Sequence, residues 1–502
     1  MIQLEISPAL LAFATLLLAT AYVVIQRRKA NISTSSLPPG PPGHWLLGNT
    51  IPREHAHRKF EEWIQEYGPV ISLRRGREVI VIIGRYDAAV EIMEKEGASL
   101  ADRPPSIAAG ETLSGGMRTL LLRNGERLRK LRKALHAQLR PIIAAEYQPI
   151  QQRNAQFHIL DLLSDSASHM SHAQGYAASV IMSLTYGKPT RTVYSDPIVQ
   201  EVVGCQTRLG KALVPGAYSV DAFPFLQYIP GYLSELREQH RMELALFKSQ
   251  LEGVRSDLNA DKEMKPCFAK TIIERQQEYG LTDDETAYLA GSMFGAGAGT
   301  SASAISIVVM AAAAFPETQV KVQEQLDSVL GARKLPTFQD EQDLVQVTAF
   351  YLESFRWRPV SAGGFAHRAT KDIIWNGHVI PAGASVYGCH WSIARDPMVF
   401  PDPEKFDPQR WVAPDGNAIR EDLKVFQYGF GRRVCPGSGV ANKSLFINTA
   451  LLLWAFRISQ DPKKPIDTMA FTNTANTHPL PFSARFESRH DVEEMKRLLK
   501  ES

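Results

Sequence analysis

Residues 426–437 read FQYGFGRRVCPG, a segment with three glycines, two arginines and a single cysteine. A glycine has no Cβ, so the three glycines allow the backbone to turn sharply and to approach a flat ligand closely. Arg433 lies two residues before Cys435 and is placed to pair with an acidic group of that ligand. Together these residues meet the needs of an iron–thiolate bond. The alternative is a buried cysteine in a glycine-rich turn.

The residues after this segment favour a reactive thiol. An apolar stretch at 440–456 predicts a helix whose N-terminus points toward Cys435. The partial positive charge of a helix N-terminus and nearby backbone N–H groups stabilise a thiolate, so we expect a lowered pKa for Cys435. The other cysteines are interpreted as buried structural residues: Cys205, Cys267 and Cys389.

The overall composition narrows the class of protein. The chain has 502 residues, of which 44% are hydrophobic and 22% charged, and this excludes disordered, collagen-like and multi-span membrane proteins. A formal net charge of +3 argues against a strongly basic nucleic-acid-binding protein. Four cysteines without framework spacing exclude a disulfide-stapled secreted domain and indicate a reducing compartment.

A long apolar helix is predicted in the middle of the chain. Residues 282–285 read TDDE, a capping-box start, and an alanine-rich stretch then continues to Phe315, where Pro316 ends it. Four glycines lie inside this stretch: Gly291, Gly295, Gly297 and Gly299. They indicate either a closely packed neighbour or a local bulge where a ligand approaches the backbone, and we favour the bulge. Thr300 would then turn its hydroxyl into a pocket.

A second helix, predicted at 344–357, carries Glu353 and Arg356 on one face. Apolar residues surround this pair, so we expect it to be buried and to need a further partner. Short strand-like runs occur at 70–73, 79–83, 373–380, 385–387 and 482–486. Helices dominate between them, which makes the fold class mostly α with a minor β part.

The N-terminus predicts a membrane anchor. Residues 6–25 carry no charge, and 20 residues at about 1.5 Å each span the roughly 30 Å hydrocarbon core. Basic residues 27–29 follow at once, which places the rest of the chain in the cytosol. A cleaved signal peptide is disfavoured because a basic n-region is missing. We therefore expect an anchor at 1–29, a linker with a proline-rich hinge at 30–44 and a catalytic domain at 45–502.

The cysteine segment resembles the haem-binding signature Phe-x-x-Gly-x-Arg-x-Cys-x-Gly of the cytochrome P-450 monooxygenases. Tyr428 stands where the family usually has Phe, and the remaining positions match at Gly431, Arg433, Cys435 and Gly437. Three further segments resemble family landmarks in the right order: AGAGTS at 296–301, ESFR at 353–356 and FDPQRW at 406–411. The anchor and the hinge resemble the microsomal eukaryotic branch, and the overall pattern resembles fungal members of secondary metabolism.

The resemblance implies a cytochrome P-450 fold, with a long central helix over the haem and small β-sheets. It implies haem b (iron-protoporphyrin IX), with Cys435 as the axial thiolate ligand of the iron. Thr300 would help to deliver protons to oxygen, within an oxygen-binding segment that includes Ala296, Gly297 and Gly299. Further cofactor contacts are implied for Arg132, His367, Phe430, Gly431, Arg433 and Gly437. Glu353, Arg356 and Arg410 would form a structural triad.

Some positions depart from the family pattern. Gly299 stands where the family usually carries Asp or Glu, so the source of protons is open: Asn, Ser, water or a substrate hydroxyl could substitute. Leu128 replaces a usual tryptophan, while Arg132 keeps the usual arginine. His367 is expected at the propionates, and the alternative is a rim histidine that bonds to the backbone.

The implied reaction inserts one oxygen atom from O₂ into a C–H or C=C bond, so the enzyme is an oxidoreductase acting on paired donors. The implied electron donor is NADPH–cytochrome P-450 reductase at the endoplasmic reticulum membrane, and the lipid bilayer is a second partner. The basic run at 127–133 either meets that flavoprotein or is a solvated face. Substrate contacts are implied in segments 104–122, 205–233, 291–300, 361–365 and 472–480, whose apolar residues, Phe223 and Phe225 among them, suit a small terpenoid or alkaloid.

Two other functions remain open. One is a haem-thiolate isomerase or dehydratase, which acts on a peroxide or hydroxyl substrate without a reductase, and the lack of an acid at Gly299 favours it slightly. The other is a non-enzymatic, membrane-tethered carrier of haem or of a hydrophobic ligand. A requirement for NADPH and a reductase separates the monooxygenase from both.

Overall fold

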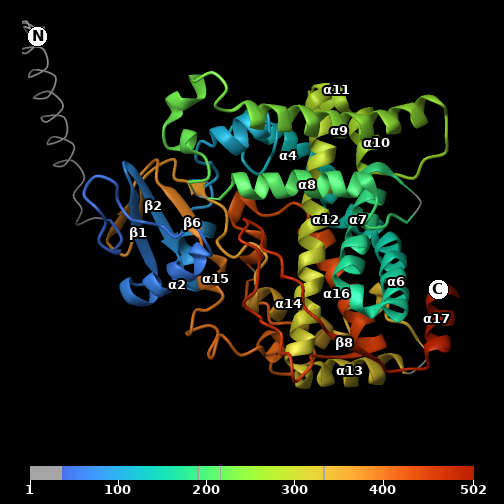
Figure 1. Ribbon diagram of the computed structural model, residues 1–502. Coiled ribbons are helices and arrows are strands. Elements are labelled where there is room, and N and C mark those ends of the chain that lie inside the picture. Colours follow the sequence, from blue (N-terminus) through green and yellow to red (C-terminus); the bar gives the residue numbers. More distant parts are fainter. Residues whose placement is uncertain (1–36, 189–190, 215, 332–333, 425, 502) are drawn as a thin grey trace, which may run out of the picture.

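The computed structural model describes residues 37–188, 191–214, 216–331, 334–424 and 426–501. Helix α12 (Asp283–Ala314) passes through the centre of the molecule (Figure 1). Its first turn has the expected capping box, in which Thr282 and Glu285 bond reciprocally to each other's backbone. Pro316 opens α13 (Pro316–Leu330), so the sequence-based limits of the long helix are confirmed.

Helices make up most of the fold and surround α12, which confirms the expected class. Besides α12 and α13, the longer ones are α2 (Ala56–Tyr67), α4 (Glu126–Leu139), α6 (Gln148–Ser164), α7 (His169–Tyr186), α8 (Pro197–Ala212), α9 (Ser234–Asn259), α14 (Val345–Trp357), α16 (Ser438–Ala455) and α17 (Val492–Glu501). Helices α7 and α16 pack directly against α12 inside one large apolar core (Figure 1). The apolar helix expected after the cysteine segment is α16.

The main sheet lies to one side of the helices, beside α2 (Figure 1). Its order is β1-β2-β6-β3, with bounds β1 (Val70–Arg75), β2 (Glu78–Ile83), β3 (His367–Arg368) and β6 (Ser385–Gly388). Strands β1 and β2 form an antiparallel hairpin, and β6 runs parallel to β2. Two smaller pairs are β4 (Ile373–Trp375) with β5 (His378–Ile380), and β7 (Phe456–Ser459) with β8 (Arg485–Ser488). The last strand therefore begins three residues later than the sequence indicated.

The prediction of a bulge in the long helix is wrong. Residues 283–314 form an uninterrupted α-helix, and the glycines make room for neighbouring side chains instead. A Cβ at Gly291 would lie 2.1 Å from the ring of Phe247 on α9, and one at Gly295 would lie 1.9 Å from Nε2 of Gln206 on α8. These glycines let α8 and α9 approach the helix axis closely.

The expected anchor at 1–29 and the first part of the linker lie outside the described residues. Within the described part of the chain, α12 is the one helix long and apolar enough to cross a membrane, but 72% of its most apolar window is buried inside the protein. It is therefore the core helix. The proline-rich hinge is attached to the sheet, because the Ser72 amide donates to Pro39 O at 2.9 Å and the Ser72 hydroxyl to Pro38 O at 2.6 Å.

Candidate active site

The cysteine segment is a tight loop held against the N-terminal third of the chain. Gly431 has a φ of +50°, in the left-handed region that favours glycine, and a Cβ there would lie 3.0 Å from Gly97 Cα. Its amide donates to Glu94 Oε1 at 3.0 Å. The Cys435 amide donates to the carbonyl oxygen of Tyr428 at 2.8 Å. The backbone around Cys435 is thus fixed on both sides.

The Cys435 thiol borders an internal space. The residue is exposed, yet the pKa of its thiol is raised by burial, which outweighs the opposing effects of the Gly437 amide and the charge of Arg132. A thiol that solvent can reach although surrounding atoms desolvate it lies in a recess of the protein. The expectation of a lowered thiol pKa is wrong for the protein alone, because the start of α16 offsets only part of the desolvation. At Gly437 a Cβ would meet only Cys435 Sγ, at 3.9 Å.

Arg433 is buried beside this cavity, and all three of its guanidinium nitrogens donate to carbonyl oxygens of the preceding segments. Nε bonds to Ala101 O at 2.6 Å, Nη1 to Thr119 O at 3.3 Å and Nη2 to Leu122 O at 2.5 Å. Burial, and then the charge of Arg132, lower the pKa of Arg433 to about 10. Arg433 therefore organises residues 101–122 around the loop.

Two further arginines lie near Arg433. Arg103 is buried and donates to Leu120 O and Phe365 O, each at 3.1 Å; burial and then the charge of Arg433 lower its pKa to about 9. Arg132 on α4 donates to Val434 O at 3.1 Å, beside the cysteine. The sequence motifs indicated Arg132 and Arg433 as cofactor ligands. They did not indicate Arg103, because this residue lies in none of the motifs.

His367 and Phe430 complete this side of the cavity. His367 on β3 is buried, and its Nδ1 lies 2.7 Å from Leu100 O, which is the backbone bond of the alternative interpretation. Burial, followed by the charge of Arg103, holds the pKa of His367 well below its usual range. The Phe430 ring is buried, 5.2 Å from Phe426 and 6.4 Å from His367.

Among the described residues, Asp102 is the one carboxylate that raises the pKa of members of the arginine cluster, which consists of Arg103, Arg132 and Arg433. Besides burial, the charges of Arg433 and Arg132 lower the pKa of Arg103, and the charge of Arg132 lowers the pKa of Arg433, so an anion beside the cluster would stabilise its charged form. Asp102 raises the pKa of Arg103 and Arg433, but its carboxylate also lies 3.3 Å from Arg123 and 3.9 Å from Arg368. An accessible thiol next to uncompensated cations fits a metal-centred ligand with acidic groups, as haem b with its two propionates is.

Helix α12 contributes another wall. Ala296 is exposed in the middle of this mostly buried helix, and Gly299 and Thr300, one turn later, are half-buried. The Thr300 hydroxyl donates to Ala296 O at 2.7 Å. Gly297 lies on another side, where a Cβ would be 2.6 Å from Ile181 on α7. Gly297 therefore allows helix packing, and it does not face the cavity with its neighbours.

The wall formed by α12 joins the arginine cluster through two loops. Ser303 on α12 donates its hydroxyl to Thr477 O at 2.8 Å, and the Thr477 amide donates to Val360 O at 2.7 Å. The segment that begins at Val360 continues to Phe365, whose carbonyl accepts from Arg103. The sequence-indicated segments 361–365 and 472–480 thus lie next to each other and against α12 just after segment 291–300, whereas Phe223 and Phe225 are exposed.

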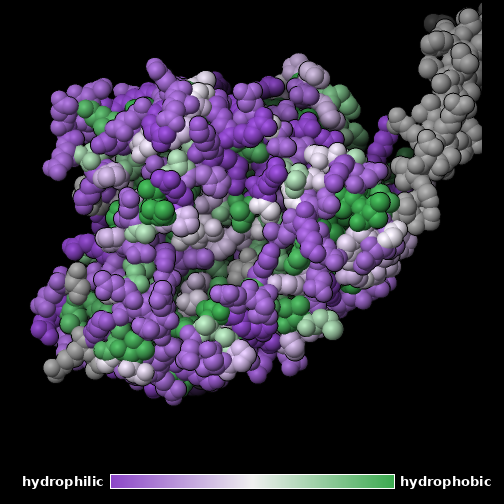
Figure 2. Space-filling view, turned by 180° about the vertical axis from the view of Figure 1, so that it is seen from behind, coloured by the Kyte–Doolittle hydropathy of each residue, from purple (hydrophilic) through white to green (hydrophobic). Residues whose placement is uncertain are grey.

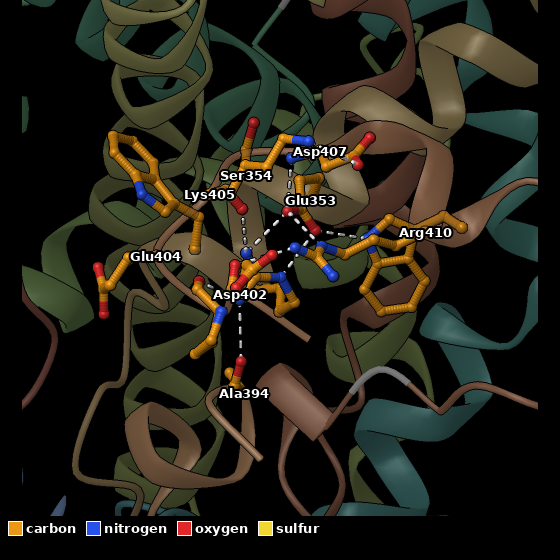
Figure 3. Close-up of polar contacts among 12 residues, drawn as sticks. Glu353, Ser354, Ala394, Asp402, Glu404, Lys405, Asp407 and Arg410 are labelled. Atoms are coloured by element: carbon orange, nitrogen blue, oxygen red, sulfur yellow. Dashed lines mark hydrogen bonds and ion pairs between the residues drawn. The ribbon is translucent and has the colours of Figure 1, made fainter. Parts of the chain in front are cut away.

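The Glu353–Arg356 pair is buried as expected, and it anchors a network of polar contacts (Figure 3). Glu353 accepts from Arg356 Nη2 at 2.7 Å and Nε at 2.8 Å, from the Asp407 amide at 2.9 Å and from Trp411 Nε1 at 2.9 Å. Arg410 Nε lies 3.5 Å from Glu353 Oε1. The structure therefore brings the expected three residues together and adds Trp411, whose indole N–H the sequence motif did not single out.

Arg356 extends this network to the chain after β6. Its Nη1 donates to Ala394 O at 2.9 Å and Pro403 O at 2.8 Å, and its Nη2 donates to Lys405 O at 3.1 Å (Figure 3). One buried pair thus fixes residues 394–411, the segment that leads into the cysteine loop.

Tyr428, the departure from the family signature, has a specific partner. Its hydroxyl donates to Asn442 Oδ1 on α16 at 2.6 Å, and its ring contacts Phe355 on α14 edge to face at 5.6 Å. The tyrosine therefore keeps the aromatic contact of a phenylalanine and adds a bond from the loop to α16.

The basic run at 127–133 is not one free surface. Arg127 Nε and Lys130 Nζ both bond to Glu285 on α12, each at 2.9 Å. Lys133 Nζ lies 5.8 Å from the centre of the Tyr279 ring, and Arg132 faces the cysteine loop. Arg129 remains exposed. These contacts leave only part of the run available to a partner protein.

Comparison with known proteins agrees with this site. The Cytochrome P450 family profile matches residues 38–486. The chain is 55% identical over 489 residues to cytochrome P450 monooxygenase 64 of Postia placenta, an alignment that covers 97% of this chain and 98% of the relative. It is 33% identical over 502 residues to a cytochrome P450 monooxygenase of Armillaria gallica, covering 97% of this chain and 95% of that protein.

Proposed function

The chain belongs to the cytochrome P450 family, and on that premise we propose that it oxidises a small apolar metabolite with electrons that reach it from NADPH through a membrane-bound reductase. As a family member it is a monooxygenase that binds haem b through a cysteine thiolate. The observation that carries the proposal is the accessible, desolvated thiol of Cys435 beside the arginine cluster.

We assign the residues around the cavity as follows. Cys435 Sγ would hold the iron of haem, and Arg103, Arg132 and Arg433, with His367 beside them, would hold the propionates. When bound, haem b supplies the activation of O₂, because thiolate ligation donates electron density to the iron. Glu353, Arg356 and Arg410 hold the loop that presents Cys435.

The remaining steps belong to the protein's own groups. Thr300 Oγ1 now donates to Ala296 O, and a rotation about its χ1 turns that proton toward the cavity. Apolar walls keep bulk water from the reacting centre, which strengthens every polar contact inside. Ser361 and Asn476, hydrogen-bonded at 2.6 Å, supply polar atoms that orient a substrate.

We propose a small apolar substrate of secondary metabolism, a terpenoid or an alkaloid. The walls contributed by α12 and by segment 104–122 are rich in alanine and leucine, with few charged groups, which suits such a ligand. The relatives come from fungi, and this supports a fungal metabolite as substrate.

We propose that the reductase docks near the cysteine loop. Arg129 on α4 and Arg432 in the loop are exposed cations close in sequence to Arg132 and Cys435. A negatively charged flavoprotein surface would pair with them, and such docking weakens as ionic strength rises.

We also propose attachment to the endoplasmic reticulum membrane, with the catalytic domain in the cytosol. Trp45 and Leu47 are 81% and 70% exposed directly after the hinge, and Phe225 is 64% exposed in the loop before α9. Figure 2 shows hydrophobic surface on the side of the molecule where the described chain begins. Exposed apolar side chains of this size suit contact with lipid.

The proposal is tested with the purified full-length chain loaded with haem. We expect a thiolate-type spectrum of the reduced carbon monoxide complex, and substrate-dependent NADPH consumption that requires added reductase. Product formed from a peroxide without NADPH or reductase would favour the isomerase or dehydratase alternative. Haem binding with no NADPH consumption for any metabolite of the host would favour a carrier.

A further inference from the structure

Gly299 leaves the side chain of Thr300 without the neighbouring acid that the family pattern provides, and His478 occupies the adjacent space. A Cβ at position 299 would lie 3.7 Å from His478 Cε1. Cε1 lies between the two ring nitrogens, so the polar edge of the imidazole faces the position that a carboxylate at 299 would fill. A glycine there gives the ring room.

The backbone of His478 is held firmly in this place. Its amide donates to Thr472 Oγ1 at 3.0 Å, and its carbonyl accepts from the Thr472 amide at 2.9 Å. The preceding Thr477 bonds to Ser303, four residues after Gly299 on α12, and to Val360. These contacts fix the loop to the helix turn that carries Gly299 and Thr300.

The imidazole is free to bond with a water or a ligand. Within the described part of the chain its ring nitrogens make no hydrogen bond, and neither is sealed from solvent. Burial alone lowers the pKa of His478, and no charged side chain of the described elements contributes to that shift. The ring is therefore neutral at pH 7, with one nitrogen as donor and the other as acceptor.

The Thr300 hydroxyl lies at the level of the same helix turn. Side chains on an α-helix tilt toward its N-terminus, and the bond from Thr300 Oγ1 to Ala296 O shows this tilt. Gly299 and Thr300 are consecutive residues on this turn, and an ordered water between the imidazole and the hydroxyl would connect them.

We propose that His478 is the proton-relay residue that takes the place of the missing acid and passes protons toward Thr300. The nitrogen on the solvent side takes up a proton, and the opposite nitrogen then releases its proton toward Thr300. A rotation of the ring brings the new N–H to the cavity side and restores the starting arrangement. One proton enters the cavity per cycle, and only N–H and O–H bonds are made and broken. This inference rests on the proposed monooxygenase function, since it assigns the source of that reaction's protons.

The test compares the parent, His478→Leu, His478→Gln and the double variant Gly299→Asp/His478→Leu, all as haem-loaded full chains. The control is His490→Leu, which removes an imidazole that packs on Trp454 instead. The first readout involves no turnover: the infrared C–O stretch of the reduced carbon monoxide complex, recorded from pH 5 to 8. The second is product formed per NADPH over the same pH range.

We expect the frequency of the C–O band of the parent to change only when the pH falls below 6.5, which is the ordinary pKa of histidine, because burial lowers the pKa of this ring. His478→Leu and His478→Gln lose that shift, and product per NADPH falls about tenfold, since a positioned proton donor contributes roughly 10²–10⁴-fold and water replaces part of it. Gly299→Asp restores coupling in the His478→Leu background. His490→Leu behaves like the parent.

Three results overturn the inference. In the first, the C–O band and the product formed per NADPH stay unchanged in both His478 variants. In the second, Gly299→Asp does not restore the product per NADPH that His478→Leu loses. In the third, the resting spectrum of the parent shows iron ligated by nitrogen, and this spectrum disappears in His478→Leu. Absence of a thiolate-type carbon monoxide spectrum in the parent refutes the proposed function itself, so the two failures are distinguishable.

Discussion

Replacing Glu353 by glutamine removes the charge at the centre of the buried network and keeps its shape. The parent carboxylate accepts four hydrogen bonds, two from Arg356 and one each from the Asp407 amide and the Trp411 indole. Glutamine has one acceptor oxygen, and its NH₂ group points toward N–H donors from which it cannot accept a hydrogen bond. Arg356, 1% exposed, keeps its charge but loses its counter-ion.

The magnitude follows from this burial. Removal of one partner of a buried ion pair costs about 3–5 kcal/mol, because the other charge stays desolvated. Unfolding entropy is about 2.1 cal/mol/K per residue, or about 1 kcal/mol/K for the roughly 450 residues of the matched domain. The Tm of Glu353→Gln should therefore fall by about 3–5 °C, and the fraction of chain that retains haem should fall with it.

The assay follows loss of the thiolate-type carbon monoxide spectrum at one fixed heating rate, because large domains unfold irreversibly. The matched control is Glu238→Gln, which breaks the Glu238–Arg241 pair of the same spacing on exposed α9, where the side chains are 55% and 74% exposed. Such surface pairs contribute about 0–1 kcal/mol, so this Tm should change by about 1 °C or less. Equal Tm shifts for the two variants would refute the argument from burial.

Three other substitutions test the cysteine loop. Gly431→Ala should prevent haem incorporation, because φ is +50° and the new Cβ would lie 3.0 Å from a neighbouring Cα, whereas Gly363→Ala, with no atom within 4 Å, should give the parent haem content. Tyr428→Phe should lower stability by about 1 kcal/mol through the lost bond to Asn442, measured as Tm, with an unchanged carbon monoxide spectrum. Cys435→Ala should abolish the thiolate-type spectrum, and its survival would show that another group binds the iron.

Elements with strong local signals could be predicted from the sequence. The capping box at Thr282 and the proline at 316 mark both ends of α12 because each acts on backbone groups within a few residues of itself. The burial of Glu353 with Arg356 was also predictable, since apolar residues surround the pair on its own helix. Local chemistry decides these features, so no knowledge of distant neighbours was needed.

Features decided by distant segments could not be predicted in this way. Whether Gly291 and Gly295 form a bulge depends on Phe247 and Gln206, which reach α12 from two other helices. The basic run looked free because Glu285, its partner, lies about 155 residues further along the chain. Arg103 stands in no spaced pattern, and only the fold brings it to Arg433.

The arginine cluster carries a free-energy cost in the folded chain that depends on pH. Arg103 and Arg433 have lowered pKa values in the folded chain, so their charged forms are less stable there than in the unfolded chain. At pH 7 both remain protonated, and the penalty is therefore present throughout the physiological range and is relieved only as the pH rises through about 9 and 10. On the proposed assignment, haem propionates beside these arginines would offset this penalty. Haem binding would then stabilise the folded chain at this cluster as well as at Cys435, because a ligand that binds only the folded chain shifts the equilibrium toward it.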